Sequence, residues 1–171
     1  SVAAAANAAA GSRTAELSFS SFGTVRSATV VQRGQKRTWD EWKEDEIASR
    51  DPDTDQTGPT DSPAGDGIPN LLKYATGLDP LKPCGSVVQI STEKTNGGAF
   101  LVLAWPVNPE ATGIRHLVES SEDLQTWTEM AEVETEGKSS AIFRDTVPIN
   151  AESPPRRFLR LKISREEENP H

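Results

Sequence analysis

Six short β-prone runs between residues 86 and 164 constrain the fold of this chain most strongly. Branched, aromatic and alternating residues fill "SVVQIST", "AFLVLAWPV", "IRHLVESS", "TWTEMAEV", "SAIFRDTV" and "RRFLRLKIS". Asn96-Gly97-Gly98 is typical of a tight hairpin turn, and "SSEDLQ" of a longer one. The pattern therefore predicts a mainly β fold, with a small antiparallel sandwich of the immunoglobulin or fibronectin type III kind over residues 85–165.

A helix-loop-helix segment, residues 38–84, precedes these runs. Thr38 is followed three residues later by Glu41, the spacing of a capping box, so an acidic helix is predicted over about residues 38–49. Large apolar residues fall near one face of that helix and are read as core anchors: Trp39, Trp42 and Ile47. The predicted second helix starts at Pro69 and ends at Gly77 in the left-handed conformation. Its predicted apolar face consists of Leu71, Leu72 and Ala75.

The stretch "DSPAGDGIPNLLKYATGLDP" that leads into the second helix looks like a calcium loop. If Gly67 occupies loop position 6, the ligand positions 1, 3, 5, 9 and 12 fall on Ser62, Ala64, Asp66, Asn70 and Lys73. Asp66 and Asn70 suit calcium, whereas Lys73 places a cation where a bidentate acid is needed. A calcium site in this register is therefore not expected.

A composite calcium site is a second possibility, because "DPDTD" has aspartates at every other residue. Such a site would draw on five acids: Asp51, Asp53, Asp55, Asp61 and Asp66. The alternative interpretation is that these aspartates cap helix ends and form Asx turns.

Sugar binding is considered for two tryptophans of the β region, Trp105 and Trp127, whose flat rings could face a carbohydrate. The alternative places both in the core or between the sheets, because Trp105 ends a strongly apolar strand and Trp127 follows a turn.

Catalysis is not expected, since the internal His116 lies in a predicted strand and no nucleophile, metalloprotease or phosphate-loop motif is present. Cys84 is the sole cysteine, so no intrachain disulfide is possible.

A net charge of -8 and a pI near 4.8 oppose general binding to nucleic acid or anionic lipid. No apolar run reaches the roughly 18 residues that cross a bilayer, so no membrane span is expected.

Three further segments complete the predicted organisation: a flexible alanine-rich leader at 1–14, two N-terminal strands within 15–37 that turn near Gly23, and an acidic tail at 166–171. Because the chain starts at Ser1, we expect it to be a processed mature form or a fragment, from which any signal peptide has been removed.

Four stretches together resemble a C-terminal module common in secreted proteins of Verrucomicrobia and related bacteria. They are the "W..W" pair of the acidic helix, "AGDGIPNLLKYATGLDPL", "HLVESSEDLQTWT" and "RRFLRLKIS". The similarity covers about residues 38–165, and its loop part also looks like thrombospondin type 3 and dockerin repeats. The resemblance implies a secreted, non-catalytic appendage, with no catalytic residues to transfer to this chain.

The predicted function is accordingly a non-catalytic structural or adhesive module, located outside the cell or at its surface. Protein partners or self-assembly are expected, and the β-prone segment from Leu17 to Val31 is a candidate strand donor to a neighbouring sheet. Two alternatives stay open, a carbohydrate-binding module and an accessory, non-catalytic subunit of a larger secreted complex.

Overall fold

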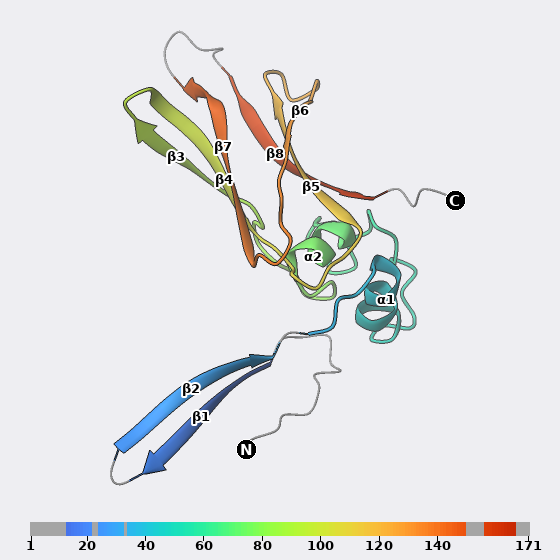
Figure 1. Ribbon diagram of the computed structural model, residues 1–171. Helices are drawn as coiled ribbons and strands as arrows, with labels where there is room; N and C mark the ends of the chain where they lie inside the picture. The colour runs from blue at the N-terminus through green and yellow to red at the C-terminus, as the bar shows by residue number, and fades with distance from the viewer. Residues whose placement is uncertain (1–12, 22–23, 33, 150–155, 167–171) are drawn as a thin grey trace, which may run out of the picture. The chain divides into compact units, whose positions relative to one another are not determined.

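The computed structural model describes residues 13–21, 24–32, 34–149 and 156–166, and divides the chain into two compact units, Ser1–Arg37 and Thr38–His171. In the first unit, β1 (Arg13–Ser21) and β2 (Thr24–Gln32) pair antiparallel (Figure 1). Their register runs without a shift from Arg13 opposite Gln32 to Ser21 opposite Thr24, which confirms the two predicted strands. Most of the predicted leader, the turn residue Gly23 and the tail beyond residue 166 lie outside the described residues.

The described part of the second unit is mainly β and contains two three-stranded antiparallel sheets (Figure 1). The first has the order β3-β4-β7 and the second β6-β5-β8. The strands span β3 (Gln89–Thr95), β4 (Gly98–Pro106), β5 (Ile114–Ser121), β6 (Thr128–Glu132), β7 (Ser140–Ile149) and β8 (Phe158–Arg165). Each of the six predicted runs thus contains most of one strand.

Apolar residues from both sheets form the main core. Its buried members are Leu103, Trp105, Val107, Val118, Ala141 and Leu159. The tight turn between β3 and β4 is confirmed, because Thr95 pairs with Gly98 across Asn96 and Gly97. The β strands therefore pack as a sandwich-like arrangement around a shared apolar layer.

The first helix begins as the sequence predicts and then changes its hydrogen-bond spacing. Thr38 caps α1 (Trp39–Lys43): its backbone N–H donates to Glu41 Oε2 at 2.8 Å, and Glu41 N–H donates to Thr38 Oγ1 at 3.3 Å. The chain continues as a π-helical segment, η1 (Glu44–Ala48). There, Ser49 N–H donates to the carbonyl of Glu44, five residues back.

The second helix, α2 (Asn70–Thr76), ends at Gly77 with φ of 73°, as predicted. It begins one residue later than predicted, because Pro69 is extended and occupies the N-cap position. The predicted apolar face is only partly right, because Leu71 and Leu72 are half-buried. The most deeply buried residues of α2 are instead Asn70, Lys73, Tyr74 and Ala75, each 0% exposed. Sequence periodicity missed this face because two of its members are polar.

An aromatic cluster joins the two helices. The ring centroids of Trp39 and Trp42 lie 5.4 Å apart, and Tyr74 lies 5.7 Å and 5.4 Å from them. Pairs in this range stabilise a fold by about 0.5–1.5 kcal/mol beyond the area that they bury. Both tryptophans are at most 5% exposed, as expected of core anchors.

Hydrogen bonds attach the C-terminal end of α2 to the segment between β4 and β5. Asn108 donates from its backbone N–H to the carbonyl of Ala75 and from Nδ2 to that of Tyr74, both at 2.9 Å. The Tyr74 hydroxyl donates to the Thr112 carbonyl at 2.9 Å and accepts from the Thr112 N–H at 2.8 Å. The helical segment is thereby part of the β-containing unit. None of the helices described here has the length and apolar character needed to span a membrane.

Candidate functional site

The two tryptophans considered as sugar platforms, Trp105 and Trp127, lie in different environments. Trp105, 2% exposed, is part of the main core, and its Nε1–H donates to Nδ1 of His116 at 3.1 Å. His116 is 1% exposed, and burial lowers the pKa of its imidazole. Because Nδ1 accepts this bond, the neutral ring carries its proton on Nε2. Trp105 and His116 therefore act as a packed, hydrogen-bonded core pair rather than as a surface platform.

Trp127 is half-buried, and a cation covers its ring. The Arg160 guanidinium carbon lies 4.0 Å from the ring centroid, and Trp127 Nε1–H donates to the carbonyl of Leu124 at 3.3 Å. Arg160 and Lys162 both bind the Glu119 carboxylate, at 2.7 and 2.8 Å. The Trp127 ring thus packs against Arg160, which belongs to a network of charged residues on β5 and β8. A sugar would have to displace Arg160 in order to stack on the ring.

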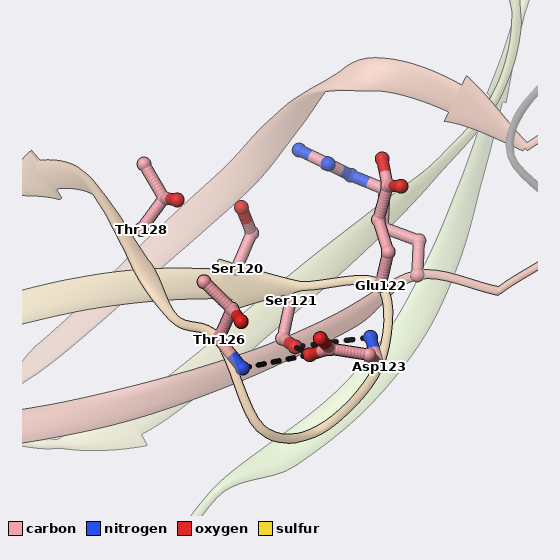
Figure 2. A pocket seen from close by; sticks show the side chains of 7 residues that line it. Ser120, Ser121, Glu122, Asp123, Thr126 and Thr128 are labelled. Atoms are coloured by element: carbon pink, nitrogen blue, oxygen red, sulfur yellow. Dashed lines mark hydrogen bonds between the residues drawn. The ribbon is translucent and has the colours of Figure 1, made fainter.

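A polar pocket that the sequence did not predict lies beside the turn between β5 and β6 (Figure 2). The turn is fixed by Asp123, whose Oδ1 accepts hydrogen bonds from Gln125 N–H at 2.8 Å and Thr126 N–H at 2.7 Å. These bonds, with one from the Ser121 hydroxyl, lower the pKa of Asp123 to about 2. The local sequence signal for this site is "SSEDLQ", which by itself predicts only a turn.

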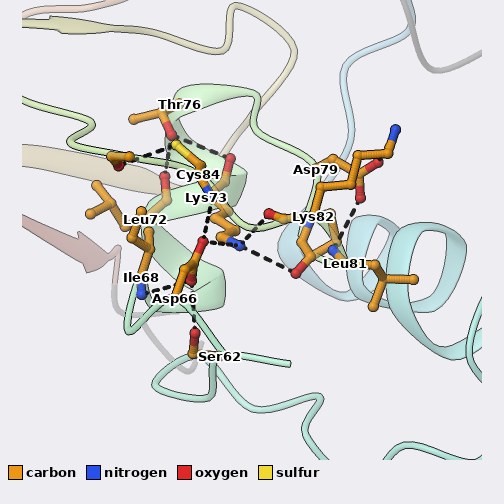
Figure 3. A network of polar contacts seen from close by, with 12 residues as sticks. Ser62, Asp66, Ile68, Leu72, Lys73, Thr76, Asp79, Leu81, Lys82 and Cys84 are labelled. Atoms are coloured by element: carbon orange, nitrogen blue, oxygen red, sulfur yellow. Dashed lines mark hydrogen bonds and ion pairs between the residues drawn. The ribbon is translucent and has the colours of Figure 1, made fainter. Parts of the chain in front are cut away.

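The calcium-like loop encloses a buried ion pair (Figure 3). Lys73 Nζ lies 2.8 Å from Asp66 Oδ2, and the two side chains are 0% and 5% exposed. Asp66 also accepts from the Ser62 hydroxyl at 2.9 Å and from the N–H groups of Ile68 and Cys84 at 3.0 and 2.9 Å. These contacts, that of Lys73 foremost, hold the pKa of Asp66 well below its usual range. The carboxylate therefore stays charged at neutral pH.

Backbone oxygens complete the surroundings of the Lys73 ammonium. Its Nζ donates to the Lys82 carbonyl at 3.0 Å and to the Pro80 carbonyl at 3.3 Å. With Asp66, these oxygens match the three donors of an ammonium group. The loop thus supplies oxygen ligands, and the cation that they hold is a side chain of α2 itself.

The remaining residues of the predicted loop hold the backbone. Gly67 has φ of 73°, which only glycine adopts without strain, so the predicted turn glycine is confirmed. Asn70, at the ninth position of the calcium register, donates from Nδ2 to the carbonyls of Gln56 and Gly58, both at 3.0 Å. Asp61 accepts from Gly58 N–H at 2.7 Å, in the manner of the predicted turn-forming aspartates.

The five aspartates predicted as a composite calcium site are not gathered at one point. Asp53 and Asp55 are exposed, and Asp51 lies in a turn where Thr54 N–H donates to its carbonyl at 3.2 Å. Within the described ranges, no group of three or more His, Cys, Asp or Glu side chains is arranged to hold a metal ion. Asp66 is the one of the five that contacts a cation, Lys73, and its carboxylate is already saturated with hydrogen bonds.

In comparisons with known proteins, no family model, curated protein or solved structure matches the chain.

Proposed function

We propose that the chain is a non-catalytic structural or adhesive module of an extracellular assembly, and that copies of it associate through the edge strand β3. The observation that carries this proposal is the exposure of β3: all seven of its residues are exposed. Strand β3 pairs with β4 on one side only within the described sheets. Its other side offers a row of backbone N–H and C=O groups to a partner strand.

The start of β3 lacks the features by which proteins protect sheet edges. Residues 89–92 carry neither charge nor proline, and Ile90 is 62% exposed. Charges occur only in the second half of β3, at Glu93 and Lys94. Among the edge strands of the described β-module, β3 is the one whose residues are all exposed, so it is the edge that we propose accepts a strand.

The β1–β2 hairpin supplies the matching element. It belongs to a unit of its own, and its two nine-residue strands pair with each other. A two-stranded hairpin is marginally stable in water, so a further strand would stabilise it. We infer that the hairpin of one copy adds to β3 of another, through β-strand addition.

Two observations support a structural role. The helical segment is fixed by a buried ion pair and an aromatic cluster, and its attachment to the β-module uses both backbone and side-chain hydrogen bonds. His116 is enclosed in the core and bonded to Trp105. An extracellular location rests on the resemblance to modules of secreted bacterial proteins.

The test compares Ile90→Lys with Ile142→Lys by light scattering over a range of concentrations. Ile142 is the matched control because it lies in the same sheet and is 67% exposed. A lysine at position 90 should weaken association of the full chain about tenfold by charging the accepting edge, while Ile142→Lys leaves association unchanged. Deletion of residues 1–37 should abolish it. A wild-type chain that stays monomeric at every concentration, or equal effects of both lysines, would refute the proposal.

A further inference from the structure

The polar pocket beside the β5–β6 turn has the dimensions of a small-ligand site. It encloses about 340 Å³, at the lower end of the range for ligand pockets. The side chains that line it are Ser120, Ser121, Glu122, Asp123, Thr126, Thr128 and Arg157 (Figure 2). They come from the end of β5, the following turn, the start of β6 and the segment just before β8.

The pocket opens on the face of the β6-β5-β8 sheet that also carries core residues. Ser120 is directly opposite Thr128 in β6 and Leu159 in β8, and directly opposite residues share a face. Leu159 belongs to the main core, so the pocket continues the inner layer of the sandwich. Trp127 alternates with Thr126 and Thr128 along the chain and contacts Arg160 instead.

A buried carboxylate positions the cationic side of the pocket. Asp145 of β7, whose side chain is 0% exposed, binds the Arg157 guanidinium through both oxygens: Nη2 lies 2.8 Å from Oδ1, and Nε contacts Oδ2. The bidentate pair fixes the plane of Arg157 and neutralises its charge. The Arg157–Asp145 pair therefore carries no net charge where Arg157 lines the pocket.

Charge excludes several ligand classes. An anion would meet the Glu122 and Asp123 carboxylates, and Asp145 already neutralises Arg157. A divalent cation would face the guanidinium, and Asp123 Oδ1 is occupied by backbone donors. An apolar ligand would leave the serine and threonine hydroxyls without partners, which costs free energy. The lining suits an uncharged ligand that both donates and accepts hydrogen bonds.

We propose that this pocket binds a neutral carbohydrate, through one sugar residue of a glycan. Sugar hydroxyls are simultaneous donors and acceptors, which matches a lining that combines the hydroxyls of Ser120, Thr126 and Thr128 with the Glu122 carboxylate and the Arg157 guanidinium. The pocket replaces Trp105 and Trp127 as the place where this chain contacts sugar. Its occupation does not depend on assembly through β3, so the two proposals fail independently.

The test is a titration of the ¹⁵N-labelled chain with D-glucose, D-galactose, D-mannose and N-acetyl-D-glucosamine, followed by amide chemical shifts. At least one sugar should shift the amides of the pocket residues. Thr128→Val keeps the shape and removes an exposed hydroxyl, and should weaken binding about tenfold, as should Ser120→Ala. Thr60→Val, an exposed threonine in the loop before α2 that belongs neither to the pocket nor to β3, is the matched control and should have no effect.

Parallel titrations with calcium chloride and sodium phosphate separate the ligand classes. Absence of pocket shifts with every sugar would overturn the proposal, as would sugar shifts that persist unchanged in Thr128→Val and Ser120→Ala. A response of the same amides to calcium or phosphate in place of sugar would assign the pocket to an ion and overturn it equally.

Discussion

Replacement of Lys73 by methionine tests whether the calcium-like loop is held together by an internal cation. Methionine has a similar length and no charge, so the change removes the ammonium and little else. Lys73 is 0% exposed and donates to the Pro80 and Lys82 carbonyls as well as to Asp66. Hydrogen bonds that involve a charged group contribute about 1.5–3 kcal/mol each, so the two carbonyl bonds together contribute about 3–6 kcal/mol.

Thermal unfolding followed by circular dichroism measures this loss. For a domain of this size each kcal/mol corresponds to roughly 3 °C, so Lys73→Met should lower Tm by roughly 10–20 °C. Lys73→Glu should lower it further, because it places a second carboxylate beside Asp66. Lys82→Met is the matched control: its side chain is 75% exposed and contacts Asp79 at the surface, so Tm should change little.

The pH dependence gives a second, independent check. The pKa of Asp66 is lowered in the folded chain, so the stability that this carboxylate contributes is fully present above its ordinary pKa of about 4 and is lost as pH falls through the folded value. Lys73→Met lacks the ion pair at every pH. The gap in Tm between wild type and Lys73→Met should therefore narrow in acid. An unchanged Tm in the variant, or a gap independent of pH, would refute the internal-cation argument.

Two further substitutions test the attachment of α2 to the β-module. Tyr74→Phe removes the hydroxyl that bonds both the N–H and the carbonyl of Thr112. It should lower the free energy of unfolding, measured in urea, by about 2 kcal/mol. An unchanged free energy of unfolding would show that these bonds contribute nothing. Gly77→Ala places a side chain at φ of 73°, where the added Cβ lies 3.6 Å from the Asn108 Cβ, so backbone strain of about 1 kcal/mol is expected. Gly85→Ala, at ordinary φ and with open space, is its control and should be neutral.

Local sequence signals identified elements whose cause is itself local. The capping box of Thr38 and Glu41, the left-handed Gly77 and the Asn96-Gly97 turn each act within a few residues, and the structure has all of them where they were predicted. The six β-prone runs are likewise confirmed as strands. The immunoglobulin or fibronectin type III identity of the sandwich stays a prediction.

The candidate sites were harder to predict because they join residues far apart in the chain. Hydrophobic periodicity assigned Leu71 and Leu72 to the buried face of α2, but tertiary packing buried Lys73 and Asn70 more deeply. The pocket lining needs Arg157, which is positioned by Asp145, and neither residue belongs to a local motif. Such contacts depend on strand order and register, which the sequence pattern does not specify.

The sequence by itself determined where strands, caps and turns occur. It also indicated that Lys73 opposes calcium binding in the standard loop register. Both conclusions follow from residue type and short-range spacing. Only the tertiary structure decided what Lys73 does instead. Folding brings its ammonium against Asp66 and the carbonyls of Pro80 and Lys82, where oxygen atoms surround a cation that the chain supplies itself. A buried charge requires a partner, and the position of that partner is a property of the fold.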